Sequence, residues 1–248
     1  MRLGAGPISL KGATRARLEG LAAQAVASSF DSIWVAESRA EGVGGGLAAA
    51  AMVAQTVPIR VGAAVDAGLY HPLYLAEDIA VADLTSQGRI EVLLRIGEGW
   101  VEEHLQVLAL ALSGAHISWR GEHLRIPAGI GANQPSPSHL ALNPRPAQPV
   151  VPVWIEASQP WMEEAALAIG FGIAAHWRLH AKVPAPAGRW PGMLLCPARV
   201  EPGALLESAG DRAGYFAVSV ETIEEIKDAG TRLIGPLRMP EFPGWINA

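Results

Sequence analysis

The sequence predicts an α/β domain built around a parallel sheet, and three observations lead to this fold class. The chain has 248 residues, of which 50% are hydrophobic and 17% charged, so one large core can form. In its first half, segments with helical periodicity alternate with short apolar segments. The short segments are apolar throughout, which is typical of strands covered on both faces. Strands joined by helices form right-handed βαβ units, so the sheet is a closed barrel or an open doubly wound sheet.

Four strand–helix units are predicted in the first half of the chain. Residues 14–29 form the first helix because apolar residues such as Leu18 and Leu21 recur at helical spacing. The helix over residues 47–56 ends before Pro58, since the residue before a proline disfavours helical geometry. We expect strands at residues 1–8, 32–36, 59–65 and 90–96, and helices at residues 14–29, 47–56, 71–86 and 102–112.

The second half is less regular. Residues 118–126 indicate a small hairpin that turns near Gly121. Irregular proline-rich loops are expected at residues 127–149 and 178–192, and the first is long enough to indicate a functional or mobile segment. We expect strands at residues 150–156, 171–175, 193–196 and 231–234, and helices at residues 161–169 and 221–228. This pattern leaves out a crossover helix between the sixth and seventh strands.

Composition excludes several classes of protein. A net charge of −5 gives no electrostatic reason to expect nucleic acid or an anionic membrane as partner. The single cysteine, Cys196, lies among apolar residues and is interpreted as a small buried hydrophobe. The longest apolar stretch, residues 47–54, is far shorter than the roughly 20 residues that span a bilayer. Since no signal peptide is recognisable either, we expect a soluble, cytoplasmic protein.

Five sequence phrases, taken in order, resemble one known family. They are residues 30–37 (FDSIWVAE), 71–78 (HPLYLAED), 83–89 (DLTSQGR), 119–125 (WRGEHLR) and 151–160 (VPVWIEASQP). This order is similar to that of the bacterial-luciferase-like monooxygenase family, whose members depend on a flavin or deazaflavin. The resemblance implies a TIM-type (β/α)8 barrel, here shortened, that spans residues 1–248 as a single domain.

The resemblance also implies where a site would lie. Active sites of such barrels lie at the carboxyl ends of the strands, and a flavin needs a flat apolar slot with donors for its phosphate. The cofactor-binding candidates are Ala64, Val65, Trp100, Ser158 and Trp177, and the catalytic candidates are His71, Glu98 and His176. Ser158 is equally suited to cap a helix before Pro160, and the His71–Pro72 pair is also a common helix start.

The chain departs from the family pattern at three positions. Ser38 stands where many relatives carry a histidine after the strand-two glutamate, and serine alone is a poor acid or base near neutral pH. Glu98 and Glu156 bring negative charge to the expected phosphate site. The cations that could compensate are Arg95, Arg178 and Lys182. Glu37 itself is interpreted as a catalytic acid or as the buried partner of a nearby arginine.

A dinucleotide-binding fold is the main alternative. Residues 42–46 are glycine-rich between a strand and a helix, and Asp66 follows at the distance of a ribose-binding acid. However, residues 37–41 separate the strand from the glycines, and Leu47 occupies the last position that requires a small residue. The tight strand-to-helix turn of that motif is therefore missing.

No metal site is predicted. His176 and His180 have a spacing that suits a metal on a helix, but they follow a strand. The sequence places no third ligand beside them.

Two functions follow from these observations. The first is an oxidoreductase or monooxygenase that uses FMN as reduced flavin, or a deazaflavin coenzyme, on a small organic metabolite. Its partners would be that substrate, a flavin reductase as electron donor, and a second copy of the chain in a homodimer. The second function is a relative without catalysis: a flavin- or ligand-binding protein, or the silent subunit of a luciferase-like heterodimer, which would need no cofactor.

Overall fold

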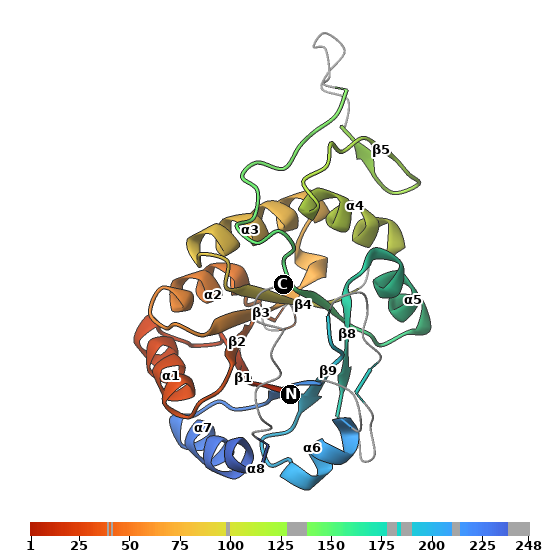
Figure 1. The fold of residues 1–248 in the computed structure, drawn as a ribbon. Coiled ribbons are helices and arrows are strands. Elements are labelled where there is room, and N and C mark those ends of the chain that lie inside the picture. Colours follow the sequence, from red (N-terminus) through yellow and green to blue (C-terminus); the bar gives the residue numbers. More distant parts are fainter. Residues whose placement is uncertain are drawn as a thin grey trace.

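The computed structural model arranges the chain as one closed barrel (Figure 1). It describes residues 1–38, 40, 42–97, 100–127, 138–177, 183–184, 190–209 and 214–237. Parallel strands follow one another around the barrel in the order β1-β10-β9-β8-β7-β4-β3-β2. They are β1 (Arg2–Ser9), β2 (Ser32–Ala36), β3 (Arg60–Asp66), β4 (Ile90–Arg95), β7 (Val153–Glu156), β8 (Gly172–His176), β9 (Met193–Cys196) and β10 (Tyr215–Val218). The predicted (β/α)8 barrel is thus confirmed, and the dinucleotide fold is wrong.

Helices surround the strands and cover their outer face (Figure 1). They are α1 (Arg15–Ala27), α2 (Gly46–Ala54), α3 (Pro72–Thr85), α4 (Glu102–Leu112), α5 (Pro160–Ile169), α6 (Pro202–Ala209), α7 (Ile223–Ala229) and α8 (Gly235–Leu237), with a 3-10 turn η1 (Ala67–Leu69) and a π-helical segment η2 (Gly230–Ile234). Side chains fix two helix starts: the hydroxyl of Thr14 accepts a hydrogen bond from Arg17 N, and that of Thr222 accepts one from Glu225 N.

Large aromatic side chains fill the interior of the barrel. Trp34, Trp154 and Tyr215 are fully buried there, and the ring centroids of Trp154 and Tyr215 lie 5.5 Å apart. Glycines make room for the indoles, because a Cβ atom at Gly62 would overlap Trp34 and one at Gly172 would overlap Trp154. The interior is therefore packed below the carboxyl ends of the strands, as expected for this kind of barrel.

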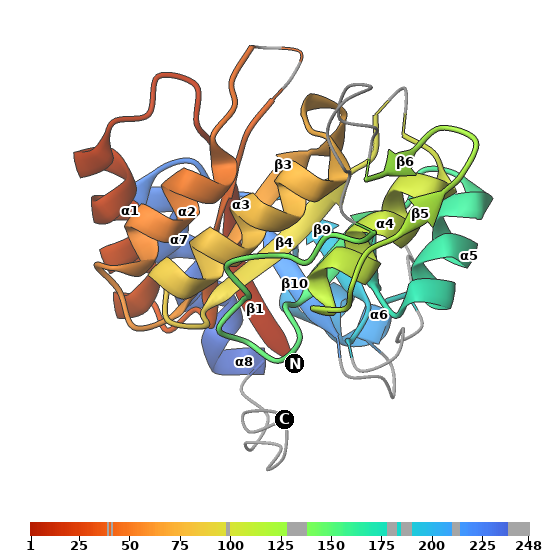
Figure 2. The same cartoon turned by 90° about the horizontal axis from the view of Figure 1, so that it is seen from above.

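The predicted hairpin is present as β5 (Trp119–Arg120) and β6 (Arg125–Ile126) on the outside of the barrel near α4 (Figure 2). Glu103 on α4 anchors it, since its carboxylate accepts hydrogen bonds from Trp119 Nε1 and Leu124 N, each at a distance between nitrogen and oxygen below 3 Å. The chain then returns to the amino-terminal end of the barrel, where Gln148 donates to Asp83 and accepts from Arg60.

One predicted strand is wrong. Residues 231–234 were expected to form the eighth strand, but they belong to η2, which continues α7. Arg232 in this segment donates hydrogen bonds to the carbonyls of Ala198 and Val200. The eighth strand is instead β10 (Tyr215–Val218), and helix α6 (Pro202–Ala209), which the sequence did not predict, precedes it.

The connection between β8 and β9 was expected to lack its helix. Its described residues, 177, 183–184 and 190–192, contain no helix. The other residues of the irregular loop predicted at 178–192 lie outside the described part of the chain, as do residues 128–137 of the loop predicted at 127–149. In the described ranges, no helix is both long and apolar enough to cross a membrane.

Candidate functional site

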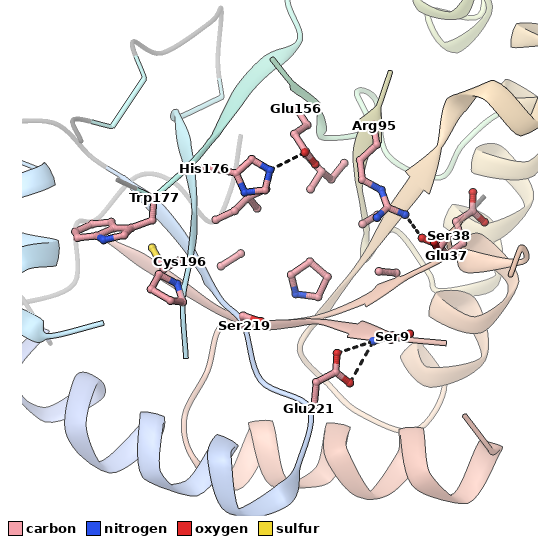
Figure 3. A pocket seen from close by; sticks show the side chains of 17 residues that line it. Ser9, Glu37, Ser38, Arg95, Glu156, His176, Trp177, Cys196, Ser219 and Glu221 are labelled. Atoms are coloured by element: carbon pink, nitrogen blue, oxygen red, sulfur yellow. Dashed lines mark hydrogen bonds and ion pairs between the residues drawn. The ribbon is translucent and has the colours of Figure 1, made fainter. Parts of the chain in front are cut away.

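A cavity of about 580 Å³ opens at the carboxyl ends of the barrel strands (Figure 3). It is lined by Pro7, Ser9, Ala36, Glu37, Ser38, Ala64, Leu93, Arg95, Glu156, His176, Trp177, Leu195, Cys196, Pro197, Ala217, Ser219 and Glu221. These residues stand at the ends of all eight barrel strands or just after them. The cavity therefore occupies the position at which (β/α)8 barrels carry their active sites.

Small aliphatic side chains form the floor of the cavity. Ala36, Ala64 and Ala217, together with Leu93 and Leu195, pack directly on the aromatic residues that fill the barrel. These alanine and leucine side chains give the cavity an apolar floor. Such a surface suits a planar ring.

Glu37 directly follows β2 and connects three parts of the chain. Its carboxylate accepts hydrogen bonds from Gly46 N at 2.9 Å, from Asp66 N at 2.8 Å and from the Tyr70 hydroxyl at 2.9 Å. Burial and the neighbouring carboxylate raise the pKa of Tyr70, so the phenol keeps its proton and donates. An arginine is nearby, as the sequence suggested, but Arg95 donates to the backbone carbonyl of Glu37 and not to its carboxylate.

Arg95 brings a positive charge to the cavity wall. One terminal nitrogen of its guanidinium is bonded to the Glu37 carbonyl, whereas its buried Nε has no hydrogen-bond partner among the described residues. A buried polar nitrogen without a partner is costly. Arg95 and Glu156 are paired residues on the adjacent strands β4 and β7, so the guanidinium lies on the same wall as that carboxylate.

Glu156 and His176 are hydrogen-bonded to each other on this same wall (Figure 3). Glu156 ends β7 and His176 ends the adjacent β8, and the distance from His176 Nε2 to Glu156 Oε1 is 2.7 Å. The side chain of Glu156 is 21% exposed and that of His176 is 67% exposed. Glu156 was expected to bring negative charge to the phosphate site, with arginine or lysine to compensate, and in the structure its hydrogen-bond partner is a histidine.

Two further lining groups, Glu221 and Cys196, are already bonded or neutral. The Glu221 carboxylate accepts from Ser9 N at 3.0 Å and contacts the Arg17 guanidinium at 3.3 Å. Burial raises the pKa of the Cys196 thiol to about 12, so it stays protonated near neutral pH. Cys196 was interpreted as a small buried hydrophobe, and the structure buries it at the edge of the cavity.

The structure brings three of the predicted site residues to the cavity. Ala64, His176 and Trp177 line it. Val65 does not line it, because side chains alternate along a strand and Val65 packs outward into the core beneath the helices. Glu98 lies outside the described residues, as do Arg178, His180 and Lys182.

Three other candidates lie elsewhere among the described residues. His71 is the N-cap of α3, where its Nδ1 accepts a hydrogen bond from Leu73 N at 3.3 Å. Trp100 donates from Nε1 to the carbonyl of Tyr70 and stacks on the ring of His104. The hydroxyl of Ser158 points to the sulfur of Met162 at 3.5 Å. None of these three residues lines the cavity. Their roles in catalysis or cofactor binding remain predictions.

The sequence did not single out several lining residues. Arg95 was considered only as a compensating cation, while Ala217 and Glu221 were not considered because the last strand was placed too late in the chain. Their signal is positional, since each of them ends a barrel strand or follows it closely. In the described ranges, no group of three or more His, Cys, Asp or Glu side chains is arranged to hold a metal ion.

Comparisons with known proteins agree with this architecture. A family model described as luciferase-like monooxygenase matches residues 3–183. No curated protein matches the chain by sequence. Solved structures do match its fold, and their sequence identities of 11–15% limit this likeness to the fold.

Three of these solved structures match most of the chain. The coenzyme F420-dependent tetrahydromethanopterin reductase from Methanopyrus kandleri has a TM-score of 0.66 at 14% identity, covering 96% of this chain and 99% of that chain. The monooxygenase RslO1 from Streptomyces bottropensis has a TM-score of 0.66 at 15% identity, covering 96% and 98%. An F420-dependent secondary alcohol dehydrogenase in complex with an F420–acetone adduct has a TM-score of 0.73 at 11% identity, covering 96% and 99%.

Proposed function

The chain belongs to the luciferase-like monooxygenase family, and from this membership we propose that it is a flavin- or deazaflavin-dependent oxidoreductase acting on a small organic metabolite. The observation that carries the proposal is the cavity at the carboxyl ends of the strands, with its apolar floor and the Arg95 guanidinium on its wall. Its volume of about 580 Å³ lies in the range of pockets that hold cofactors and small ligands.

The residues of the cavity fit a flavin-type ring. Ala36, Ala64 and Ala217 would support the flat ring, and Trp177 would border it. The guanidinium of Arg95 would donate to a polar edge or to a phosphate. When bound, such a cofactor supplies hydride transfer, and a reduced flavin also activates oxygen. The chain itself would orient the ring and exclude water from one of its faces.

The two cofactor classes both have support. Two of the matched solved structures are named as dependent on F420, which is a deazaflavin, and the third is named a monooxygenase. FMN was the first expectation from the sequence, with a deazaflavin coenzyme as the alternative. A binding experiment with FMN and a deazaflavin coenzyme would distinguish the two.

A homodimer and a flavin reductase that delivers electrons are further parts of this proposal. Exposed apolar side chains on α3 support the dimer, because Tyr74 is 66% and Val81 49% exposed one above the other on the helix. Size-exclusion chromatography with light scattering would measure the mass of the assembly.

A second candidate function is a flavin- or ligand-binding protein without catalysis, or the silent subunit of a heterodimer. Ser38 favours this candidate, because it lines the cavity where the family resemblance implies a histidine. A storage protein would bind the cofactor and stay inactive with reductant and oxygen. A silent subunit would bind neither FMN nor a deazaflavin.

The first experiment records the visible absorption of the purified protein and then titrates FMN and a deazaflavin coenzyme against tryptophan fluorescence. We expect saturable quenching with a Kd in the micromolar range for one of them. Trp177→Phe should reduce the amplitude of quenching, and Arg95→Met should weaken binding by about tenfold, the loss of one charge-assisted hydrogen bond. If the folded protein binds neither cofactor, the oxidoreductase proposal fails.

A further inference from the structure

Among the described lining residues, one side chain is suited to exchange protons with a ligand in the cavity. The Cys196 thiol keeps its proton because burial raises its pKa to about 12. The carboxylate of Glu37 is occupied by two backbone N–H groups and the Tyr70 hydroxyl, and Glu221 is bonded to Ser9 N and Arg17. Histidine is the residue whose proton exchange suits neutral pH, and His176 is the described histidine that lines the cavity.

The contact with Glu156 determines which nitrogen of His176 is available. A glutamate carboxylate only accepts hydrogen bonds, so Nε2 at 2.7 Å from Oε1 must carry a hydrogen and donate it. In the neutral ring the lone pair then resides on Nδ1. The neutral imidazole is thus held in one tautomer, in which Nδ1 is the hydrogen-bond acceptor.

Backbone hydrogen bonds hold both members of the pair in place. Glu156 is paired with Ala174 in the register of β7 and β8, and the following residue, Ala157, donates from its N–H to the Ala174 carbonyl. On the other side, Trp177 N donates to the Leu195 carbonyl, which fixes the end of β8 on β9. A pair built on strand ends keeps its geometry better than one built on loops.

We propose that Glu156 is a positioning residue that keeps Nδ1 of His176 free, and that Nδ1 exchanges the proton of a substrate hydroxyl or carbonyl group. In the oxidative direction the O–H bond of an alcohol breaks, the proton forms an Nδ1–H bond, and the electron pair left on oxygen forms the C=O bond. The carbinol C–H bond breaks at the same carbon, and its hydride would pass to the oxidised cofactor of the proposed function. In the reductive direction the carbonyl carbon would receive a hydride from the reduced cofactor, and Nδ1 returns the proton to the oxygen. These steps suit alcohols and the corresponding carbonyl compounds as substrates.

This inference rests on the proposed function, which supplies the accompanying redox chemistry. Other charged or titratable groups around the same cavity are Arg95 from β4, Glu37 from β2, Cys196 from β9 and Glu221 after β10. None of them contacts the His176 ring by a hydrogen bond between described residues, so Glu156 is the group whose removal should change the ring.

The first test measures the ring itself and needs no cofactor. The ¹⁵N chemical shifts of the histidine side chains report which nitrogen carries hydrogen, and His176→Gln identifies the signals of His176 among the seven histidines. We expect a protonated Nε2 and a free Nδ1 in the wild type, and a mixture of tautomers in Glu156→Gln. Glu164→Gln is the matched control, because it removes an exposed carboxylate on α5 without a contact to the ring.

The second test measures turnover of a panel of short primary and secondary alcohols and the matching ketones and aldehydes, with whichever cofactor binds. His176→Gln should lower kcat by about 100-fold and flatten the pH dependence of kcat/KM near neutrality. Glu156→Gln should lower kcat by about tenfold with little change in KM, and Glu156→Asp should restore part of it. Unchanged thermal unfolding would show that the variants are folded.

Three results would overturn the inference: hydrogen on Nδ1 in the wild type, ring shifts that Glu156→Gln leaves unchanged, or turnover that His176→Gln does not reduce. If the wild type binds neither cofactor, the proposed function fails and the substrate class fails with it. The ¹⁵N shifts still decide separately whether Glu156 positions His176.

Discussion

A glutamate stands at each end of the barrel, and the surroundings of the two differ. At the amino-terminal end, Glu91 is fully buried and accepts from Arg2 at 2.8 Å, from Arg60 at 2.5 Å and from the Tyr215 hydroxyl at 2.8 Å. At the carboxyl end, Glu156 is hydrogen-bonded to one side chain of the described residues, His176, on a wall open to solvent. The carboxylate of Glu91 is therefore fully hydrogen-bonded, whereas the carboxylate of Glu156 can accept further hydrogen bonds.

This difference separates stability from function within one barrel. The network around Glu91 joins the first residues of several strands and continues through Tyr215 to Trp34, whose Nε1 donates to the phenol oxygen at 2.7 Å. Every polar group of that network has a partner, as expected of a buried charge that supports the fold. At the other end, the buried Nε of Arg95 has no hydrogen-bond partner among the described residues.

The largest effect is expected from removing the charge of Glu91. Glu91→Gln keeps the size of the side chain but leaves the guanidinium groups of Arg2 and Arg60 without their partner, so the free energy of unfolding should fall by about 3 kcal/mol. Glu156→Gln is the matched change at the open end and should cost less than about 1 kcal/mol. Urea unfolding followed by tryptophan fluorescence measures the free energy of unfolding of both variants. Equal losses would contradict the assignment of stability to the amino-terminal end and of function to the carboxyl end.

The pH dependence of the same variant gives a second measurement. Burial alone would raise the pKa of Glu91, but the ion pairs with Arg2 and Arg60 outweigh it and leave the pKa below the ordinary value of 4.5. The stabilisation is therefore present above about pH 4.5 and is lost as the pH falls through the folded-state pKa. The difference between wild type and Glu91→Gln should be constant from pH 8 to about 5 and should shrink in stronger acid.

A smaller loss is expected from filling the space above the Trp34 ring. Gly62→Ala adds a methyl group where the indole already lies, so the ring or the strand must shift. Overpacking of this kind costs about 2 kcal/mol. Thermal unfolding would show it as a lower Tm.

Gly203→Ala is the control for that substitution. A Cβ atom at Gly203 in α6 meets no atom within 4 Å, so the change should be neutral or stabilising by about 0.5 kcal/mol. Similar Tm values for Gly62→Ala and Gly203→Ala would show that the interior of the barrel is not tightly packed around Trp34.

Local sequence patterns account for how well the fold was predicted. The strands from β2 to β4 were found because each is a continuous apolar run next to a helix with clear periodicity, which is a local signal. Residues 231–234 misled because they include the β-branched Thr231 and Ile234, yet they continue a helix whose contacts lie far away in the sequence. Tyr215–Val218 was missed because the helix α6 that precedes it was not recognised and the last strand was placed at residues 231–234.

The sequence predicted those site residues that can be recognised from their position at the end of a strand. His176 and Trp177 were found because they end a strand, whereas the side of the strand decides between Ala64 and Val65. The pairs Glu156–His176 and Arg95–Glu37 depend on which strands become neighbours when the barrel closes. A single sequence does not contain that information, so the partners of these charges could not be assigned from it.

The smallest effect is expected at His71, which was a catalytic candidate from the sequence and is the N-cap of α3 in the structure. His71→Ala removes the acceptor for Leu73 N and should lower the free energy of unfolding by about 1 kcal/mol. His71→Asn retains an acceptor and should cost a few tenths of a kcal/mol. Burial lowers the pKa of His71, so the folded protein favours the neutral ring that can accept this hydrogen bond.

The capping contribution of His71 should therefore be present above its ordinary pKa of 6.5 and decrease as the pH falls below that value. His71→Asn should lose this dependence because an amide does not titrate. The comparison of the two variants between pH 8 and about 5 thus isolates the cap from the groups in the cavity. If His71→Asn destabilises the protein as much as His71→Ala at every pH, the histidine makes a contact other than the cap, and its place among the candidates for substrate binding would be restored.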